Sequence, residues 1–263
     1  MNKVKSYDVS GKHEGDVSLP SVFDTPFRPD LIKKAVLAEQ ANQRQPYGSD
    51  PLAGKKTSAH YHGSRHYRFS MMNKGISRMP RIHGKVGYMA LRGRFAPHAV
   101  KGRPAHPPKV EKIWSQKINA KEKTFAIMSA LAASSNMELV KKRGHKVSES
   151  PVIFNDGIEK IKKSKEAVSA FSKIFSDEIN RCSVKKVKAG ISKMRGRRYT
   201  VKKGPLVIVS GKCDLMKSAK NIMGFDVVPV ESLSAEKLAP GTHAGRAVII
   251  SQAALKKIEA RYC

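Results

Sequence analysis

The sequence predicts an α/β protein in three layers, with a mainly parallel sheet between helices and a long extended basic loop inserted after the first helix. Two observations predict this fold. Short runs of Val, Ile and Leu alternate with helical patterns along the second half of the chain, as buried parallel strands and their crossover helices do. Residues 46–115 keep neither the period of a strand nor that of a helix, so we expect them to lie outside the sheet.

Two helices flank this irregular segment. The first is predicted to begin at Pro29 and to end near Gln45, with an apolar face of Leu31, Ile32, Ala35, Val36 and Ala38. The second is predicted to follow Asn119 and to run to about Ser135. Glu122 stands three residues after Asn119, and this spacing predicts a capping box at the start of the second helix.

The second half of the chain supplies the sheet. The predicted strands are residues 151–154, 206–209, 225–230 and 247–250. The predicted helices between and after them are residues 166–175, 214–223 and 251–261. Asp214 is a candidate N-cap and Gly224 a candidate C′ residue for the middle one of these helices.

The charge is concentrated in two segments. The chain has a net charge of +30, and residues 41–115 hold fifteen Lys or Arg against two acids. Residues 181–203 hold ten Lys or Arg and no acid. Such an imbalance requires a polyanionic partner, and nucleic acid fits best because a basic chain gains affinity by displacing counterions from phosphates. No apolar run is long enough to span a membrane, so we expect no membrane partner.

The composition of the long loop favours RNA over DNA. Glycines would let its backbone approach phosphates, prolines would keep its path extended, and rings beside Arg65 and Arg68 could stack on unpaired bases. These residues are Gly75, Gly84, Gly87, Gly93, Gly102, Pro104, Pro107, Pro108, His60, Tyr61, His62, His66, Tyr67 and Phe69. The loop is either disordered in isolation or folds only against a partner. A solvated linker is the alternative, which embedded apolar residues such as Ile82 and Leu91 disfavour.

The sequence supplies no catalytic, metal or cofactor site. GPLVIVSGKCD has the wrong glycine spacing for a phosphate loop, and Cys213 replaces the hydroxyl residue that would hold magnesium. His60, His62 and His66 could bind a metal, but RNA contact suits them better because no cysteine or carboxylate is near. We therefore expect a protein that is not an enzyme and needs neither metal nor cofactor.

The N-terminus and the cysteines indicate the cytosol. MNKVKSYDVSGKHEGD has no apolar core of a signal peptide. Cys182, Cys213 and Cys263 are odd in number and far apart, which favours a reducing compartment over a disulfide framework or a paired zinc motif.

Long stretches of the chain resemble one family. They are LPSVFDTPFRPDLIKKAVLAEQANQRQPYGSDPLAGKKTSA, MPRIHG, HAVKGRPAHPPKVEKIWSQKINAKEKTFAIMSALAAS, VKAGISKMRGRRYTVKKGP, AKNIMGFDVV and LAPGTHAGRAVIISQAAL. With these stretches the chain resembles the family of large ribosomal subunit protein four in its archaeal and eukaryotic form, and more the archaeal. The resemblance runs from about Leu19 to Leu255, nearly the whole chain.

The resemblance implies a structural component of the large ribosomal subunit in the cytoplasm. In the family an α/β domain lies on the subunit surface, and the loop threads through rRNA. The loop tip lines the nascent-peptide exit tunnel and, with large-subunit protein twenty-two, narrows it. Other large-subunit proteins and the nascent polypeptide are further implied partners. Family members usually carry a small Gly-rich tip such as GSGRG, whereas this chain carries the bulkier GSRHYRFSMMNKGISR.

Carried over by position, the resemblance divides the chain. Residues 1–45 and 116–263 would form the α/β domain, 46–115 the rRNA-penetrating loop with its tip at about 63–81, and 181–203 a second RNA-binding segment. The expected RNA contacts are Arg44, Lys55, Lys56, Arg65, His66, Arg68, Arg78, Arg81, Arg92, Arg94, Lys101, Arg103, His106, Lys109, Lys112, Arg195, Arg197, Arg198, Tyr199, Lys202 and Lys203. The expected tunnel-lining residues are Arg65, His66, Tyr67, Arg68, Phe69, Met71 and Met72. An RNA-modifying enzyme and a free regulatory RNA-binding protein are the alternatives.

Overall fold

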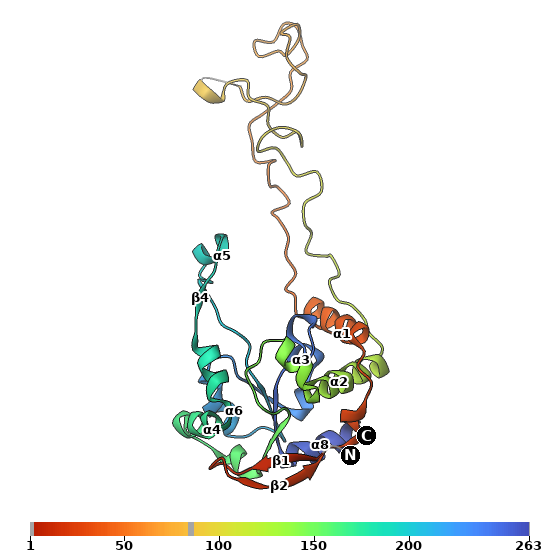
Figure 1. The fold of residues 1–263 in the computed structure, drawn as a ribbon. Coiled ribbons are helices and arrows are strands. Elements are labelled where there is room, and N and C mark those ends of the chain that lie inside the picture. Colours follow the sequence, from red (N-terminus) through yellow and green to blue (C-terminus); the bar gives the residue numbers. More distant parts are fainter. Residues whose placement is uncertain (1–2, 84–86, 263) are drawn as a thin grey trace. The chain divides into compact units, whose positions relative to one another are not determined.

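A computed structural model describes residues 3–83 and 87–262 (Figure 1). Contacts within the chain divide it into two compact units. Met1–Gln43 and Ser115–Cys263 form the first, which we call the α/β domain, and Arg44–Trp114 form the second, which we call the arm.

The strands are β1 (Lys3–Tyr7), β2 (His13–Ser18), β3 (Val152–Phe154), β4 (Lys186–Val187), β5 (Tyr199–Thr200), β6 (Leu206–Val209), β7 (Asp226–Pro229) and β8 (Val248–Ser251). The helices are α1 (Pro29–Asn42), α2 (Ala120–Ser135), α3 (Met137–Lys142), α4 (Ser164–Ser183), α5 (Ile191–Met194), α6 (Leu215–Ser218), α7 (Ala235–Leu238) and α8 (Gln252–Tyr262).

The α/β domain is built on a six-stranded sheet with the order β2-β1-β3-β8-β6-β7. All neighbouring strands are parallel except β1 and β2. The strands β3, β6 and β8 are buried along their whole length, as expected for a parallel sheet covered on both faces. The predicted mainly parallel α/β fold is confirmed, and the four predicted strands, now β3, β6, β7 and β8, each begin and end within one residue of their predicted bounds.

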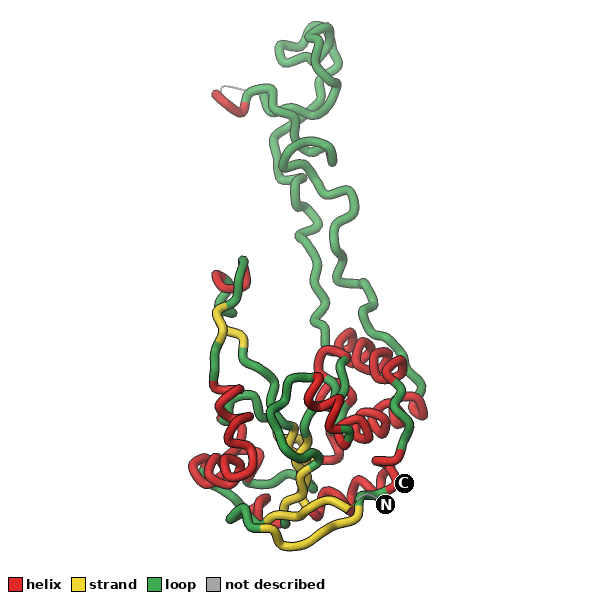
Figure 2. The backbone as a smooth tube through the Cα atoms, in the orientation of Figure 1, coloured by secondary structure: helices red, strands yellow, loops and turns green. Residues whose placement is uncertain are grey.

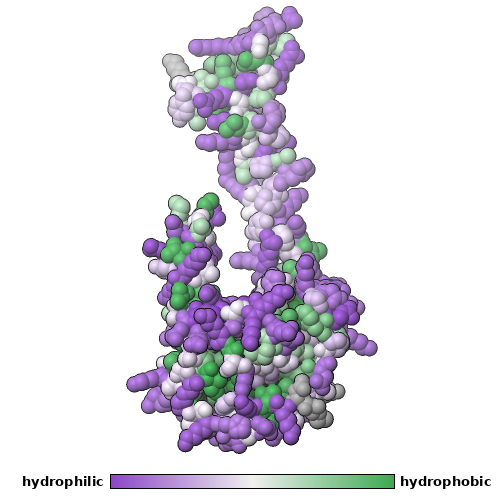
Figure 3. All heavy atoms as spheres, viewed as in Figure 1, coloured by the Kyte–Doolittle hydropathy of each residue, from purple (hydrophilic) through white to green (hydrophobic). Residues whose placement is uncertain are grey.

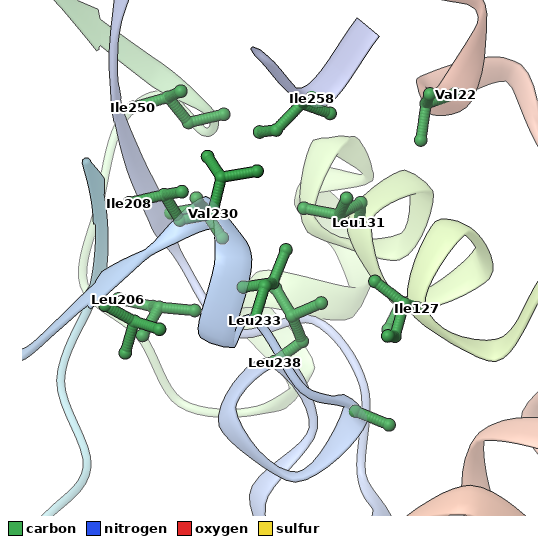
Figure 4. Close-up of a cluster of buried hydrophobic side chains, with 14 of the residues drawn as sticks. Val22, Ile127, Leu131, Leu206, Ile208, Val230, Leu233, Leu238, Ile250 and Ile258 are labelled. Atoms are coloured by element: carbon green, nitrogen blue, oxygen red, sulfur yellow. The ribbon is translucent and has the colours of Figure 1, made fainter. Parts of the chain in front are cut away.

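Alternate residues of each strand enter different cores. Leu206 and Ile208 of β6 pack with α1, α2 and α8 on one face of the sheet (Figure 4). Val207 and Val209 of the same strand pack with α4 and α6 on the other face. Because successive side chains of a strand point to opposite faces, a run of four apolar residues supplies both cores at once. This arrangement places the sheet as the middle of three layers.

The two helices beside the arm form largely as predicted. α1 begins with Pro29 at its first position and ends at Asn42, three residues earlier than expected. α2 follows Asn119 as predicted, but the predicted capping box is wrong. The Asn119 side chain makes no capping hydrogen bond, and Glu122 instead accepts a hydrogen bond from Lys34 Nζ of α1 at 2.7 Å. The Glu122 carboxylate therefore binds a lysine of α1 and not the backbone at the start of its own helix.

The helices on the other face of the sheet differ in length from their predicted ranges. α4 continues beyond the predicted end at residue 175, through a non-helical kink at Phe175, because Glu178 and Cys182 are buried and hold the next turns against the domain. α6 is shorter than predicted, and a 3₁₀ turn at Ala219–Asn221 follows it. Because the helical turns end at Asn221, Gly224 is not the C′ residue that the sequence predicted; with a φ of +83° it turns the chain into β7.

The sequence did not reveal the N-terminal hairpin. β1 pairs antiparallel with β2 and parallel with β3, so the hairpin extends the sheet on one side. Only Ser6 of its strand residues is buried, and β2 reads HEGDVS. A strand with so many polar residues lacks the alternation of apolar and polar residues that predicts a strand. Its charged residues are typical of the exposed edge of a sheet.

The arm has little regular structure. Among its described residues, the only helical turn is a 3₁₀ turn at Gly87–Met89, and the rest is drawn as loop in Figure 2. Isolated antiparallel bridges join His60 to Arg81 and Arg81 to Gly93. Across residues 3–83 and 87–262, no helix has the length and apolar character needed to cross a bilayer.

Candidate nucleic-acid interface

The two limbs of the arm are held together by main-chain contacts. Ser49 N donates to Pro108 O at 3.2 Å. Farther along, Gly54 has a φ of +74°, and a Cβ at this position would collide with the backbone of Gly102. A Cβ at Gly102 would in turn collide with the carbonyl oxygen of Ala96. Gly102 is therefore needed for packing inside the arm. Gly84, a predicted phosphate contact, lies outside the described residues.

The distal part of the arm has a small core of its own. His60 and Arg81 exchange two main-chain hydrogen bonds of 3.0 and 3.1 Å, and Ile82 exchanges two more with Leu91 and Arg92. Three chain segments are thereby joined side by side. Met71 is 1% exposed and Ile82 8% exposed. The buried side chain of Met71 is unavailable to a tunnel, which corrects its expected place among the tunnel-lining residues.

Two expected RNA contacts also form hydrogen bonds within the arm. The Arg81 guanidinium donates to Leu91 O at 2.8 Å and to Ser77 O and Oγ at 3.0 and 2.9 Å. Arg94 donates to Val100 O at 2.9 Å. Each guanidinium thus satisfies carbonyl groups that a chain without regular structure leaves unpaired. For Arg81 at least, the donors are used within the arm.

The rings of the distal arm pack against one another. The His62 ring lies 4.1 Å from that of Tyr67 and 4.5 Å from that of His83, and the Phe69 ring lies 5.3 Å from that of His83 (centroid distances). Both ring nitrogens of His83 are buried without a hydrogen-bond partner, and burial lowers the pKa of His83. His60 and His62 belong to this aromatic cluster, in which their ring centroids lie 6.2 Å apart. Among the described residues, no three His, Cys, Asp or Glu side chains lie together as metal ligands would.

The remaining predicted contacts of the arm are directed outward. Hydrophilic residues, purple in Figure 3, cover much of its visible face. The exposed ones among the expected contacts are Arg44, Lys55, Lys56, Arg65, His66, Arg68, Arg78, Arg92, Lys101, His106, Lys109 and Lys112, and Arg103 is half-buried. Lys56 is paired with Asp50, one of the two acids of the arm. The arm therefore presents cations along its whole length.

The second basic segment forms a hairpin in the α/β domain. β4 and β5 pair antiparallel through Lys186–Thr200 and Val187–Tyr199, and α5 lies between the two strands in the chain. Lys188 N donates to Arg198 O at 2.8 Å, which continues the pairing. The expected contacts Arg195, Arg197, Arg198, Tyr199, Lys202 and Lys203 are all exposed. Of these only Lys203 has an acidic partner, Asp226, at 3.2 Å.

A buried ionic cluster holds the base of this hairpin, and sequence reasoning missed it. Arg181 donates to both carboxylate oxygens of Glu178 and, at 2.7 Å, to Lys203 O across the hairpin. His145 Nδ1 lies 2.6 Å from Glu178 Oε1. Burial alone would raise the pKa of Glu178, but hydrogen bonds with His145, Arg181 and the Lys146 N–H lower it to about 2. Arg181 therefore belongs to the foot of the hairpin, although the sequence shows it only as part of a basic run.

Arg246 provides a second anchor at the same place. Its side chain is 1% exposed, and it donates to Gly204 O at 2.8 Å, to Lys237 O at 2.8 Å and to Asp226 Oδ2 at 2.7 Å. The residues after β5 are thereby tied to the strand β7. Nothing in the local sequence distinguishes Arg246 from a surface arginine, because its partners are distant along the chain.

Glu159 links the carboxyl ends of three parallel strands, β3, β6 and β8. Its carboxylate accepts hydrogen bonds from Ser210 N and Oγ at 2.7 Å each, just after β6, and from Ser251 Oγ of β8 at 2.6 Å. Glu159 itself lies in a 3₁₀ turn that follows β3. This edge is where open α/β sheets usually bind their ligands, and here protein side chains occupy it.

Known proteins match this chain over nearly all of its length. Residues 17–261 match the Ribosomal protein L4/L1 family. The chain is 41% identical to the large ribosomal subunit protein uL4 of Methanosphaera stadtmanae, covering 98% of this chain and 96% of that protein. It is 43% identical to the large ribosomal subunit protein uL4 of Methanococcoides burtonii, covering 100% of both.

Proposed function

The chain belongs to the ribosomal protein L4/L1 family, and we propose that it binds large-subunit rRNA through the arm and the β4–β5 hairpin and lines part of the nascent-peptide exit tunnel. Its place in the large ribosomal subunit, and hence in translation in the cytoplasm, follows from the family and from relatives that are more than 40% identical. The resemblance to the archaeal form is likewise shown by these relatives.

The distribution of exposed cations is the observation that carries the rRNA-binding role. The arm and the hairpin hold most of the net charge of +30, and almost all their basic side chains are exposed. Phosphates supply the missing negative charge, and the release of their counterions supplies affinity. Because the limbs are joined through main-chain contacts, their side chains remain free to point towards RNA on several sides.

The distal arm is the part proposed to line the tunnel. Arg65, His66, Tyr67 and Arg68 are exposed there, whereas Phe69 and Met72 are partly buried. The lining we propose consists of these residues without Met71. Large-subunit protein twenty-two and the nascent chain would be the neighbours of this part, and other large-subunit proteins those of the domain.

A non-catalytic role agrees with the sheet. In α/β enzymes the carboxyl ends of parallel strands usually open into a ligand crevice. Here Glu159 joins the turn after β3 to Ser210 and Ser251, so its carboxylate is engaged in holding strand ends together. The sheet thus has a structural role within the α/β domain.

Binding of the purified chain to large-subunit rRNA tests the rRNA role, with small-subunit rRNA as competitor. We expect saturable binding at moderate salt that survives excess competitor and weakens steeply as the salt concentration rises. In cells, the tagged chain should sediment with large subunits in a sucrose gradient and be released only by high salt. Recovery in the free-protein fractions at moderate salt would refute the structural role and favour a free regulatory protein.

A further inference from the structure

A cavity lies at the base of the arm, where its two limbs begin and end. Its volume is about 760 Å³, and it is lined by Tyr47, His106, Pro107, Pro108, Lys109, Glu111, Lys112 and Trp114. The walls combine two large aromatic side chains and two prolines with cations. A single acid, Glu111, lies among them. This mixture of flat apolar surface and positive charge is unlike the cores of the α/β domain.

Trp114 is the centre of this cavity. The Arg44 guanidinium carbon lies 3.8 Å and Lys112 Nζ 4.3 Å from the Trp114 ring centroid, and the Tyr47 ring lies 5.6 Å away at an interplanar angle of 22°. The indole Nε1 is buried and has no hydrogen-bond partner in the protein.

A purely structural role for Trp114 fits poorly. Its apolar sequence neighbours are directed outward, since Val110 is 59% and Ile113 is 84% exposed. No apolar side chain besides the two prolines and Tyr47 lines the cavity with it. In the distal arm, by contrast, Met71 and Ile82 are buried and form a true core. At the base of the arm the aromatic side chains contact cations and prolines and form no such apolar core.

We propose that this cavity binds one unpaired nucleotide of RNA, an inference that rests on the proposed rRNA-binding function. The base would stack against the layer formed by Trp114 and by Tyr47, which is 48% exposed. Lys109 and Lys112 would neutralise the phosphate. The base must be unpaired because both faces of a paired base are covered in the helix, whereas bulges and loops offer a free face.

Trp114 is the sole tryptophan of the chain, so its fluorescence reports on this cavity alone. We would titrate the full chain with a single-stranded oligoadenylate, with a fully paired RNA hairpin that is closed by a non-nucleotide linker and has an equal number of phosphates, and with inorganic polyphosphate. Binding is measured separately by fluorescence anisotropy of end-labelled RNA. We expect oligoadenylate to quench Trp114 strongly, and the paired hairpin and polyphosphate to bind without comparable quenching.

Variants separate stacking from charge. Trp114→Ala should weaken oligoadenylate binding roughly tenfold and leave hairpin binding nearly unchanged, because stacking on an aromatic side chain contributes only to the unpaired ligand. Trp114→Phe should restore most of the affinity. The matched control is Tyr88→Ala, which removes an aromatic side chain that is 77% exposed elsewhere in the arm and should change neither affinity.

Each outcome has a defined meaning. Equal quenching by all three ligands, or loss of hairpin binding together with oligoadenylate binding in Trp114→Ala, would overturn the stacking site and leave the rRNA-binding role intact. If neither RNA bound even at low salt, the proposed function itself would fall. Quenching by oligoadenylate alone, with rescue by Trp114→Phe, would establish the site.

Discussion

Among single residues, Glu178 has the largest expected influence on the position of the β4–β5 hairpin. It is fully buried, and Arg181, which is bound to it, also reaches Lys203 O on the other limb. Removal of one partner from a buried pair leaves the other charge without compensation, which costs more than the pair itself contributes. The basic residues of the hairpin are exposed by comparison, so their replacement should change binding and leave folding intact.

We expect Glu178→Gln to lower the free energy of unfolding of the full chain by about 3–5 kcal/mol at pH 7, measured by urea denaturation. Gln keeps the shape of the side chain but leaves Arg181 without a counter-charge. The control is Glu166→Gln, which removes an exposed pair with Lys163 at 3.7 Å and should change the free energy little. Equal effects of the two variants would show that the Glu178 cluster contributes no more than a surface ion pair.

The same cluster should make stability sensitive to acid. The pKa of Glu178 lies near 2 in the folded chain and below its ordinary 4.5, so its contribution is complete above about pH 4.5 and is lost as the pH falls towards 2. Burial also lowers the pKa of His145, so protonation of His145 below about pH 6.5 favours unfolding as well. Acid unfolding of the wild type, followed by circular dichroism, should therefore be steeper over pH 2–4.5 than that of Glu178→Gln.

At the scale of elements, the hairpin and the arm use different means to hold basic side chains outward. The hairpin has a two-residue ladder and a buried ionic foot. The arm has main-chain contacts between its limbs and a small distal core around Met71 and Ile82. The hairpin and the arm are both held in place by few apolar residues. For this reason the sequences of both segments resemble those of linkers.

For the hairpin, we expect replacement of Arg195, Arg197 and Arg198 by Ala to weaken binding to large-subunit rRNA and to reduce its salt dependence. Each lost phosphate contact removes roughly one unit from the slope of log affinity against log salt. The matched control replaces Lys162, Lys163 and Lys165, three exposed cations at the start of α4, by Ala. If both triple variants reduced the slope equally, overall charge and not the hairpin would explain the effect.

For the arm, limited proteolysis of the free chain should cut residues 46–58 and 103–113 first, because nearly all the side chains of these limbs lie outside any core. The region around Met71 and Ile82 should resist longer, and the α/β domain longest. Arg81→Ala should expose the distal region to early cleavage, whereas Arg78→Ala should not, since only Arg81 binds Leu91 O and Ser77 O. Distal cleavage as fast as limb cleavage in the wild type would mean that the distal core forms only with RNA.

At the scale of the whole molecule, we expect folding, assembly and the proposed tunnel lining to depend on different parts of the chain. The sheet and its two cores lie entirely within the α/β domain. The limbs carry exposed cations such as Lys55, Lys101 and Lys109, and the distal arm carries the proposed tunnel residues. A substitution confined to the domain, the limbs or the distal arm should therefore leave the functions of the other two parts unchanged.

Deletion of residues 64–78 should leave the domain folded and the chain able to enter large subunits, while it alters sensitivity to arrest peptides and tunnel-blocking antibiotics. Replacement of Lys55, Lys101 and Lys109 by Glu should block incorporation, because like charge would then face phosphate. Incorporation is measured in sucrose gradients, with the same three positions changed to Gln as a milder control. If the deletion blocked assembly and the charge reversal were tolerated, the tunnel role of the distal arm would be refuted.

The sequence by itself determined the parts whose signal is local. Runs such as Leu206–Val209 predicted the parallel strands, because burial on both faces requires an unbroken apolar run. Pro29 and Asn119 marked the starts of α1 and α2, because helix starts have their own residue preferences. The two basic segments were equally visible, since charge is counted without knowledge of the fold.

Only the tertiary structure decided which side chains are free to act. Glu178, Arg181 and Arg246 became anchors, and Arg81 and Met71 became parts of the arm, because their partners lie far along the chain or in segments without a period. β1 and β2 were not predicted from the sequence, because their polar residues form strands by pairing with each other and, through β1, with the distant strand β3. A long-range contact depends on which distant segments come together in the fold, and the residue types of one segment do not specify its partner.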